Sequence, residues 1–126
     1  MTQSEYEYDV FLICPIKDAN LVQKAKMEVY IAKLECEGKN VYYPADDTDQ
    51  NDDYGYRICM DNAQAISNSA EVHIFFDPTS KGSLFDLGVA FALGKPLVIV
   101  NPEEVERTEK KSFNNMIQVW NDLSLE

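Results

Sequence analysis

A single carboxylate, Asp86, interrupts an otherwise apolar run and closely follows Ser80, Gly82 and Ser83. A carboxylate among apolar neighbours is partly removed from water, and such groups are candidate nucleophiles or proton carriers. The two serines supply hydroxyls, and Gly82 lets the backbone approach a ligand closely. If a helix begins here, its free N–H groups also favour an anion such as a phosphate. The stretch therefore predicts a reactive carboxylate beside an anion-binding turn.

The same residues also fit a purely structural interpretation. Ser83-Leu84-Phe85-Asp86 matches the S-x-x-D form of a capping box, with Ser83 at N-cap and Asp86 at N3. An acid in the first turn is favoured by the helix dipole, by about 0.3–1 kcal/mol. A cap alone predicts that Asp86→Asn costs roughly 1 kcal/mol of stability. Capping and catalysis are compatible, because an N3 carboxylate also points toward the strand ends.

Few other residue patterns suggest chemistry. The only histidine, His73, lies in a strand-like run without a partner pattern, so we expect a packed side chain. Cys14, Cys36 and Cys59 show no zinc-binding spacing and are expected to be reduced thiols. Residues 49–55 loosely resemble a calcium loop, but the required glycine and glutamate are missing. We therefore expect no metal site.

Composition narrows the class of protein. The chain has 126 residues, 45% of them hydrophobic, which fits one compact domain over residues 1–126. A net charge of -11, with only Arg57 and Arg107 as arginines, argues against binding a nucleic-acid polymer. Asp86 and Lys95 interrupt the best apolar run, so no membrane span is expected. The acidic, polar start does not resemble a secretory signal, and we expect a cytoplasmic protein.

Strand-like and helical segments alternate along the chain. Helical spacing over 21–37 rests on Leu21, Val22, Ala25, Val29, Ala32 and Leu34. The expected strands are 8–14, 40–44, 71–77 and 95–100, and the expected helices are 21–37, 54–69, 83–94 and 112–123. This order predicts an α/β fold, a flavodoxin/Rossmann-like three-layer sandwich around a parallel sheet of four to five strands.

Ligands of such sheets bind beyond the carboxyl ends of the strands. The segments expected there are CPIKD (14–18), PADD (44–47), DPTSKGS (77–83) and NPEE (101–104). We expect Pro15, Ile16 and Lys17 to line the site from the first of these loops, where Lys17 would meet an anion.

The segment 77–100, DPTSKGSLFDLGVAFALGKPLVIV, resembles the nucleoside 2-deoxyribosyltransferase family and its relatives that hydrolyse the N-glycosidic bond of nucleoside monophosphates. The family pattern is matched at Ser80, Gly82, Leu87, Gly88, Ala90, Ala92, Gly94, Lys95 and Pro96. A weaker similarity covers most of the chain, and the fold that it implies is the same flavodoxin-like sheet. The ligand implied is a nucleoside or nucleotide. No cofactor is implied, because a covalent carboxylate route needs none.

The resemblance also implies roles for individual residues. Asp86 stands where the family has a glutamate nucleophile that forms a glycosyl-enzyme intermediate. Ser80 stands where the monophosphate hydrolases contact the 5′-phosphate, whereas the transferases carry an aspartate there. Gly82 and Ser83 would help to hold the phosphate or sugar. The family aspartate that handles the base falls at Asn62, with Asp61 beside it as a second catalytic candidate.

Four departures from the family pattern leave two functions open. Asp86 is one methylene shorter than glutamate, and Asn62 and Ala70 each replace an aspartate. Phe11, which we also expect to contact the substrate, replaces a tyrosine near the end of the first strand. The chain is expected to be either an N-glycosidase or transferase, or a catalytically impaired nucleotide-binding module that serves as a sensor or regulatory subunit. Because family pockets are often completed by a neighbouring subunit, the resemblance also implies a homodimer or a larger homo-oligomer.

The closing helix, 112–123, offers two interpretations of its own. It faces such a partner, or Met116, Val119 and Leu123 pack it onto the sheet.

Overall fold

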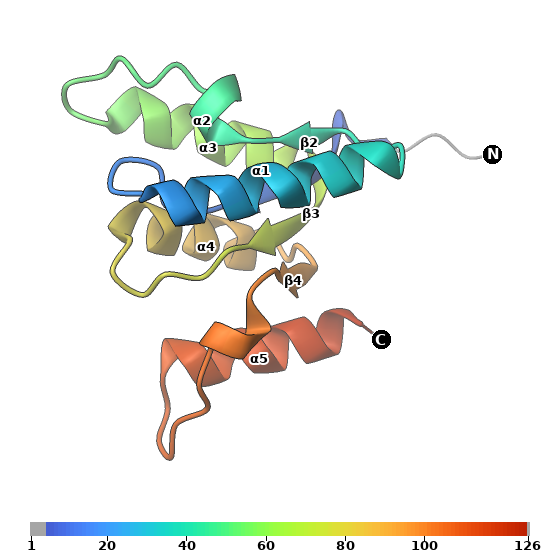
Figure 1. Cartoon of the computed structure of the whole chain (residues 1–126), viewed down its shortest axis with the longest axis vertical. Helices are drawn as coiled ribbons and strands as arrows, with labels where there is room; N and C mark the ends of the chain where they lie inside the picture. Colours follow the sequence, from blue (N-terminus) through green and yellow to red (C-terminus); the bar gives the residue numbers. More distant parts are fainter. Residues whose placement is uncertain (1–4, 126) are drawn as a thin grey trace.

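The computed structural model describes residues 5–125, which form an all-parallel sheet flanked by helices (Figure 1). Within these residues the strand order is β2-β1-β3-β4. The strands are β1 (Tyr8–Ile13), β2 (Val41–Tyr42), β3 (Ser69–Ile74) and β4 (Leu97–Ile99). The helices are α1 (Leu21–Cys36), α2 (Pro44–Asp47), α3 (Tyr56–Ser67), α4 (Lys81–Ala92) and α5 (Phe113–Ser124), with a 3-10 turn, η1, at Pro102–Glu104. The three-layer α/β fold predicted from the sequence is confirmed, with four strands in the sheet.

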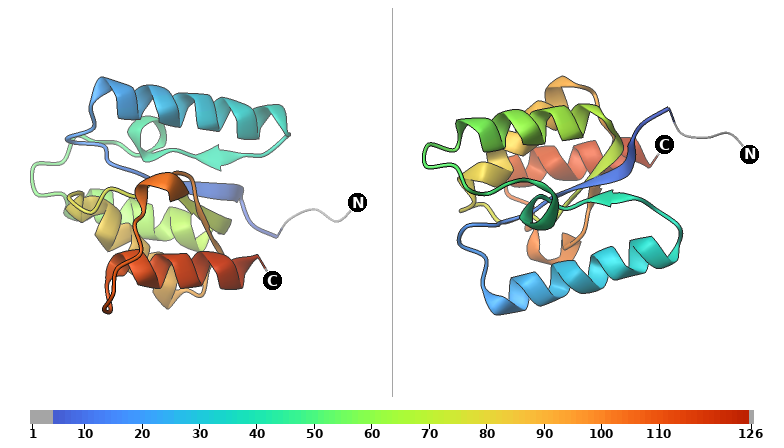
Figure 2. Two further views of the ribbon diagram at one scale, coloured as in Figure 1. Left: turned by 60° about the horizontal axis from the view of Figure 1, so that its bottom comes forward. Right: turned by 90° about the horizontal axis from the view of Figure 1, so that it is seen from above.

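Helices cover both faces of the sheet, as Figure 2 shows for α1 on one side and α3 on the other. Successive strand residues point to opposite faces. On β1, Phe11 belongs to the apolar cluster under α3 and α4, whereas Leu12 packs with Met27 of α1. Both strand residues are fully buried. The sheet is therefore hydrophobic on both faces, as expected for parallel strands.

Helix α5 covers the outer edge of the sheet instead of one face (Figure 1). The Oδ1 atom of Asn121 accepts the N–H of Ile99 at 2.9 Å, and Ser124 Oγ accepts the N–H of Leu97 at the same distance. Ile117 is fully buried in the core from the same helix. Side chains thus pair donors on β4 that a fifth strand would otherwise bond, which protects the edge from other chains.

The outward face of α1 differs from the sequence-based expectation. Its helical spacing is confirmed, but Leu21, Val22 and Val29 are mostly exposed, at 83%, 64% and 71%. The buried side is defined by Met27 and Leu34. These two residues are seven apart and therefore share one face of the helix, so apolar residues occupy both sides of α1.

Some predicted boundaries are wrong by a few residues. No helix was expected between the strand 40–44 and the helix 54–69, but α2 lies there, with Pro44 at its first position. Strand β3 begins at Ser69 instead of residue 71, and α4 begins at Lys81 instead of Ser83. None of the helices in residues 5–125 combines the length and hydrophobicity needed to cross a bilayer.

Candidate active site

A pocket of about 570 Å³ lies beyond the carboxyl ends of β1 and β3. Parallel sheets place their ligand sites at this end of the strands. The lining side chains come from the β1–α1 loop, from α3 with the segment before it, and from the start of α4: Cys14, Pro15, Ile16, Lys17, Asp18, Gln50, Gly55, Ile58, Cys59, Asn62, Asp77, Thr79, Ser80, Lys81, Gly82, Ser83 and Asp86. Of the four expected loops, 44–47 and 101–104 do not contribute.

Most residues singled out from the sequence meet in this pocket. They are Pro15, Ile16, Lys17, Asn62, Ser80, Gly82, Ser83 and Asp86. Phe11 lies outside the lining, fully buried and stacked on Tyr42 with ring centroids 5.3 Å apart. Asp61 also lies outside, because its half-exposed carboxylate pairs with Arg57 Nε at 3.8 Å. Of the two neighbouring candidates on α3, Asn62 is therefore the one that faces the pocket.

Asp86 lies in the second turn of α4, so the capping-box interpretation is wrong. The helix begins at Lys81, and its N-cap is Ser80, whose Oγ accepts the N–H of Ser83 at 3.3 Å. Ser80, three residues before Ser83, serves as the N-cap, so Ser83 lies inside the helix and cannot begin a capping box. Asp86 is thus free of any capping role.

The environment of Asp86 is largely dry. The residue is only 8% exposed, and Asn62 Nδ2 donates to its Oδ2 at 3.4 Å. Burial raises the pKa of Asp86 to about 7, and the hydrogen bond from Asn62 opposes this rise. Near neutral pH this carboxyl group therefore exchanges readily between its protonated and ionised forms.

Asp77, the other carboxylate near the start of α4, is held in a different state. It accepts hydrogen bonds from the Thr79 hydroxyl at 2.6 Å, from the Thr79 N–H at 2.9 Å and from Gln23 Nε2 at 3.2 Å. These bonds, chiefly the one from the Thr79 hydroxyl, lower the pKa of Asp77. Asp77 shapes the loop and ties it to α1, whereas Asp86 accepts a single, longer bond from Asn62. Two carboxylates whose pKa values are pushed apart are typical of sites that divide their roles.

Helix α3 positions Asn62 through its own start. Gly55 adopts a left-handed conformation (φ 79°) just before the helix, which favours glycine. The carboxylate of Asp52 accepts the N–H groups of Arg57 at 2.9 Å and Ile58 at 3.2 Å, and the bond from Ile58 is the main cause of its lowered pKa. Asp52 was not singled out from the sequence, because it precedes the helix by four residues.

Sequence reasoning missed other lining residues. Lys81 joins Lys17 as a second cation, and Thr79 adds a hydroxyl beside Ser80. Both residues lie in segment 77–83, which was expected at the ligand end of the sheet, so their place in the sequence could have identified them. Thr48 lies outside the pocket lining but donates to Asn62 Oδ1 at 2.8 Å, and nothing in the sequence indicated this contact.

The thiols and the histidine are not organised for catalysis. Burial raises the pKa of both Cys14 and Cys59, which keeps these pocket residues as neutral thiols. His73 is buried between Tyr30 and Glu71, and burial lowers its pKa. The expectation that His73 is a packed side chain is confirmed. Across residues 5–125, no three or more His, Cys, Asp or Glu side chains are grouped as a metal site would require.

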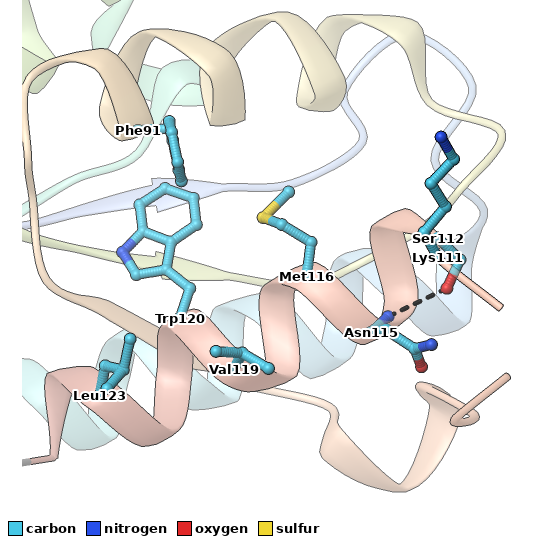
Figure 3. Close-up of a pocket in the computed structure, with 8 residues that line it drawn as sticks. All are labelled: Phe91, Lys111, Ser112, Asn115, Met116, Val119, Trp120 and Leu123. Carbon is cyan, nitrogen blue, oxygen red and sulfur yellow. Dashed lines mark hydrogen bonds between the residues drawn. The ribbon is translucent and has the colours of Figure 1, made fainter. Parts of the chain in front are cut away.

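A second cavity, an apolar groove of about 420 Å³ between α4 and α5, has a different character (Figure 3). Its lining residues are Phe91, Lys111, Ser112, Asn115, Met116, Val119, Trp120 and Leu123. The expectation that Val119 and Leu123 pack on the sheet is wrong, because they are 52% and 61% exposed. Met116 does pack against the core as expected, together with Trp120 and the fully buried Ile117. This groove contains no carboxylate, so it offers no counterpart of Asp86.

Comparisons with known proteins identify a family and a similar fold. The family model described as nucleoside 2-deoxyribosyltransferase matches residues 10–118. No curated protein sequence matches the chain significantly. Among solved structures, the chain is similar to the TIR domain of the Toll-related receptor TRR-2 from Hydra magnipapillata, with a TM-score of 0.59 and 18% identity over 86% of this chain and 78% of that one. That likeness concerns the fold alone.

Proposed function

The chain belongs to the nucleoside 2-deoxyribosyltransferase family, and we propose that it cleaves or transfers the N-glycosidic bond of a nucleoside or nucleoside monophosphate. The observation that carries the proposal is the position of Asp86. It is a nearly buried carboxylate without a capping role, and it lines a pocket that also contains hydroxyls and lysines. A nucleophile that must alternate between ionised and ester forms suits such a site.

In the proposed reaction the ionised Asp86 attacks the anomeric carbon of the sugar. The bond from that carbon to the base nitrogen breaks, its electron pair leaves with the base, and the base takes up a proton from solvent. An ester then links the sugar to Asp86, as in retaining glycosidases. Attack by water on this ester gives hydrolysis, whereas attack by a second base gives transfer. Asn62, which lines the same pocket, keeps the carboxylate in place during the attack.

The start of α4 provides the proposed site for the phosphate or sugar. Ser80 Oγ donates to Ser83 Oγ at 2.8 Å, so the two hydroxyls form one polar surface at the first turn. The first N–H groups of a helix carry partial positive charge and suit an anion. Lys17 and Lys81 line the same pocket. Together these groups favour a nucleoside monophosphate over an uncharged nucleoside.

Base release is the direct test. The protein is incubated with deoxynucleosides, ribonucleosides and their monophosphates, and free base is measured by chromatography, with and without a second base as acceptor. We expect release from at least one monophosphate and its loss in Asp86→Ala. Asp122→Asn removes an exposed carboxylate on α5 and serves as the control, which should keep full activity. Wild-type rates retained by Asp86→Ala would rule out the proposed nucleophile.

The rate of base release should depend on pH. Because attack requires the ionised carboxylate, we expect the rate to rise as the pH passes through about 7, the value to which burial raises the pKa of Asp86. The measurement is a kcat/KM profile from about pH 5 to about pH 9, compared with a profile of ligand binding. A rate that falls through this range would show that the protonated form does the work.

The alternative is a nucleotide-binding module with little or no turnover. It is favoured by the shortness of the Asp86 side chain and by the absence of a hydroxyl at Phe11. Calorimetry separates the two functions, because a module of this kind binds a monophosphate tightly while no base is released across the whole panel.

A further inference from the structure

Four buried polar side chains form a continuous hydrogen-bonded chain from β2 to α4. The hydroxyl of Tyr42 lies 2.6 Å from Thr48 Oγ1, and Thr48 Oγ1 donates to Asn62 Oδ1 at 2.8 Å. Asn62 Nδ2 in turn donates to Asp86 Oδ2 at 3.4 Å. All four residues are less than 9% exposed, at 7%, 5%, 7% and 8% along the chain. Water therefore competes little for these bonds, and each partner depends on the next.

The chain has a defined direction. A threonine hydroxyl carries one proton, and Thr48 gives it to Asn62, so its oxygen accepts from Tyr42. The Tyr42 hydroxyl also lies 3.2 Å from the carbonyl oxygen of Asp47, but its contact with Thr48, at 2.6 Å, is the shorter one. Burial raises the pKa of Tyr42, which keeps its hydroxyl protonated and able to donate. An amide whose oxygen is engaged in this way must turn its NH₂ group toward Asp86. The reversed amide would suit only a protonated Asp86, whose O–H could donate to the amide oxygen, whereas the ionised form requires the NH₂ group.

From this geometry we propose that Tyr42 and Thr48 are positioning residues, which orient the amide of Asn62 so that it stabilises the ionised form of Asp86. Neither residue lines the pocket, so both act through Asn62 and not on a ligand. The catalytic consequence rests on the proposed function, because only a carboxylate nucleophile has to be ionised. The orientation itself does not depend on any reaction.

Aromatic packing holds the first member of the chain in place. The ring of Tyr42 stacks on Phe11 at 5.3 Å with planes 10° apart, and Tyr8 meets it edge-on at 5.0 Å. Phe11 and Tyr42 are also paired neighbours in the sheet. These contacts fix the ring of Tyr42 and thereby the position of its hydroxyl beside Thr48.

Other groups near Asp86 do not oppose this assignment. Cys14 faces it from the end of β1 and Cys59 from α3, and burial raises the pKa of both thiols, so they remain neutral. Burial and the bond from Asn62 are the causes that act on the pKa of Asp86 itself. The bond is the one that lowers this pKa, and it is also the one that Thr48 directs.

The test replaces Thr48 with valine, which keeps the shape of the side chain but removes its hydroxyl. The pKa of Asp86 is measured by NMR on protein with ¹³C-labelled aspartate carboxyls, and its signal is assigned by its absence from Asp86→Asn. We expect Thr48→Val to raise this pKa by about one unit, since Asn62 loses its fixed orientation. Thr48→Ser retains a hydroxyl and should restore the wild-type titration.

Two further variants keep the result interpretable. Tyr42→Phe removes the other hydroxyl of the chain and should shift the pKa of Asp86 in the same direction, even if Thr48→Val folds poorly. Tyr30→Phe is the matched control, because it removes a hydroxyl of α1 that is bonded to His73 and not to this chain. It should leave the pKa of Asp86 unchanged. An unchanged pKa of Asp86 in both Thr48→Val and Tyr42→Phe would overturn the inference.

The same variants separate this inference from the proposed function. If wild type releases base, the pH profile of Thr48→Val should move upward together with the NMR titration. If no substrate is cleaved, the shifted titration still supports the role of Thr48 while the proposed function fails. Base release with an unshifted titration supports the function and rejects the positioning role.

Discussion

Asp86→Asn should make the protein more stable at neutral and alkaline pH, by up to about 4 kcal/mol. The expected gain follows from burial, which raises the pKa of Asp86 from 3.8 to about 7. Each unit of pKa shift corresponds to about 1.4 kcal/mol between the two protonation states. Keeping an ionised carboxylate at this buried position therefore weakens the fold, and an amide of the same shape carries no such cost.

The stabilising effect of Asp86→Asn depends on pH. Between about pH 4 and about pH 7 the folded chain keeps the proton on Asp86, whereas the unfolded chain has released it. The unfolded state then binds fewer protons, so the contribution of Asp86 to stability falls as the pH rises. The difference between wild type and Asp86→Asn should be near zero at about pH 4 and complete above about pH 8.

Urea unfolding of wild type and Asp86→Asn at several pH values measures this difference, with Asp122→Asn as the exposed control. Asp122→Asn should change stability little at any pH, because its carboxylate is exposed. A cap would give the opposite sign, a loss of roughly 1 kcal/mol in Asp86→Asn. The experiment thus distinguishes a carboxylate retained for chemistry from one retained for stability.

The fold was predictable because local patterns and global topology agree. The alternation of apolar strand segments with helical spacing is sufficient to predict a parallel sheet with helices on both faces. The edge of the sheet was not predictable, since it depends on single side chains. Asn121 and Ser124 accept hydrogen bonds from N–H groups of β4. These partners lie 22 and 27 residues apart in the sequence, and no repeating pattern connects them. The start of α4 was misplaced for a similar reason, because Ser80 and Ser83 are equally good caps by type.

The candidate site was predictable only where a sequence motif directly follows the carboxyl end of a strand. Ser80, Ser83 and Asp86 follow β3 directly, so topology alone places them at the ligand end. Residue types alone could not show whether Asp61 or Asn62 faces the ligand, because that depends on which side of α3 lines the pocket. Thr48 and Tyr42 could not be found at all, since their role arises from a contact chain through Asn62. Buried polar networks carry no spacing signature.

Asp86→Glu should raise the rate of base release by about 10²-fold, a factor typical of a reactive group moved by about 1 Å. The variant restores the length of the family nucleophile and carries the carboxylate one methylene further into the pocket. The pocket of about 570 Å³ in front of Asp86 offers the necessary space. Rates with a nucleoside monophosphate, measured for both proteins under identical conditions, give the comparison.

Asp86→Gln is the matched control for this experiment, because it has the same length without the charge and should be inactive. A gain in Asp86→Glu alone would show that the shortness of aspartate, and not the loss of a hydroxyl at Phe11, limits the wild-type rate. A slower Asp86→Glu would instead show that this pocket holds its ligand nearer to α4, within reach of the shorter side chain. In that case Asn62 and Thr48, which fix the carboxylate of Asp86 in its present place, are the residues that adapt the site to aspartate.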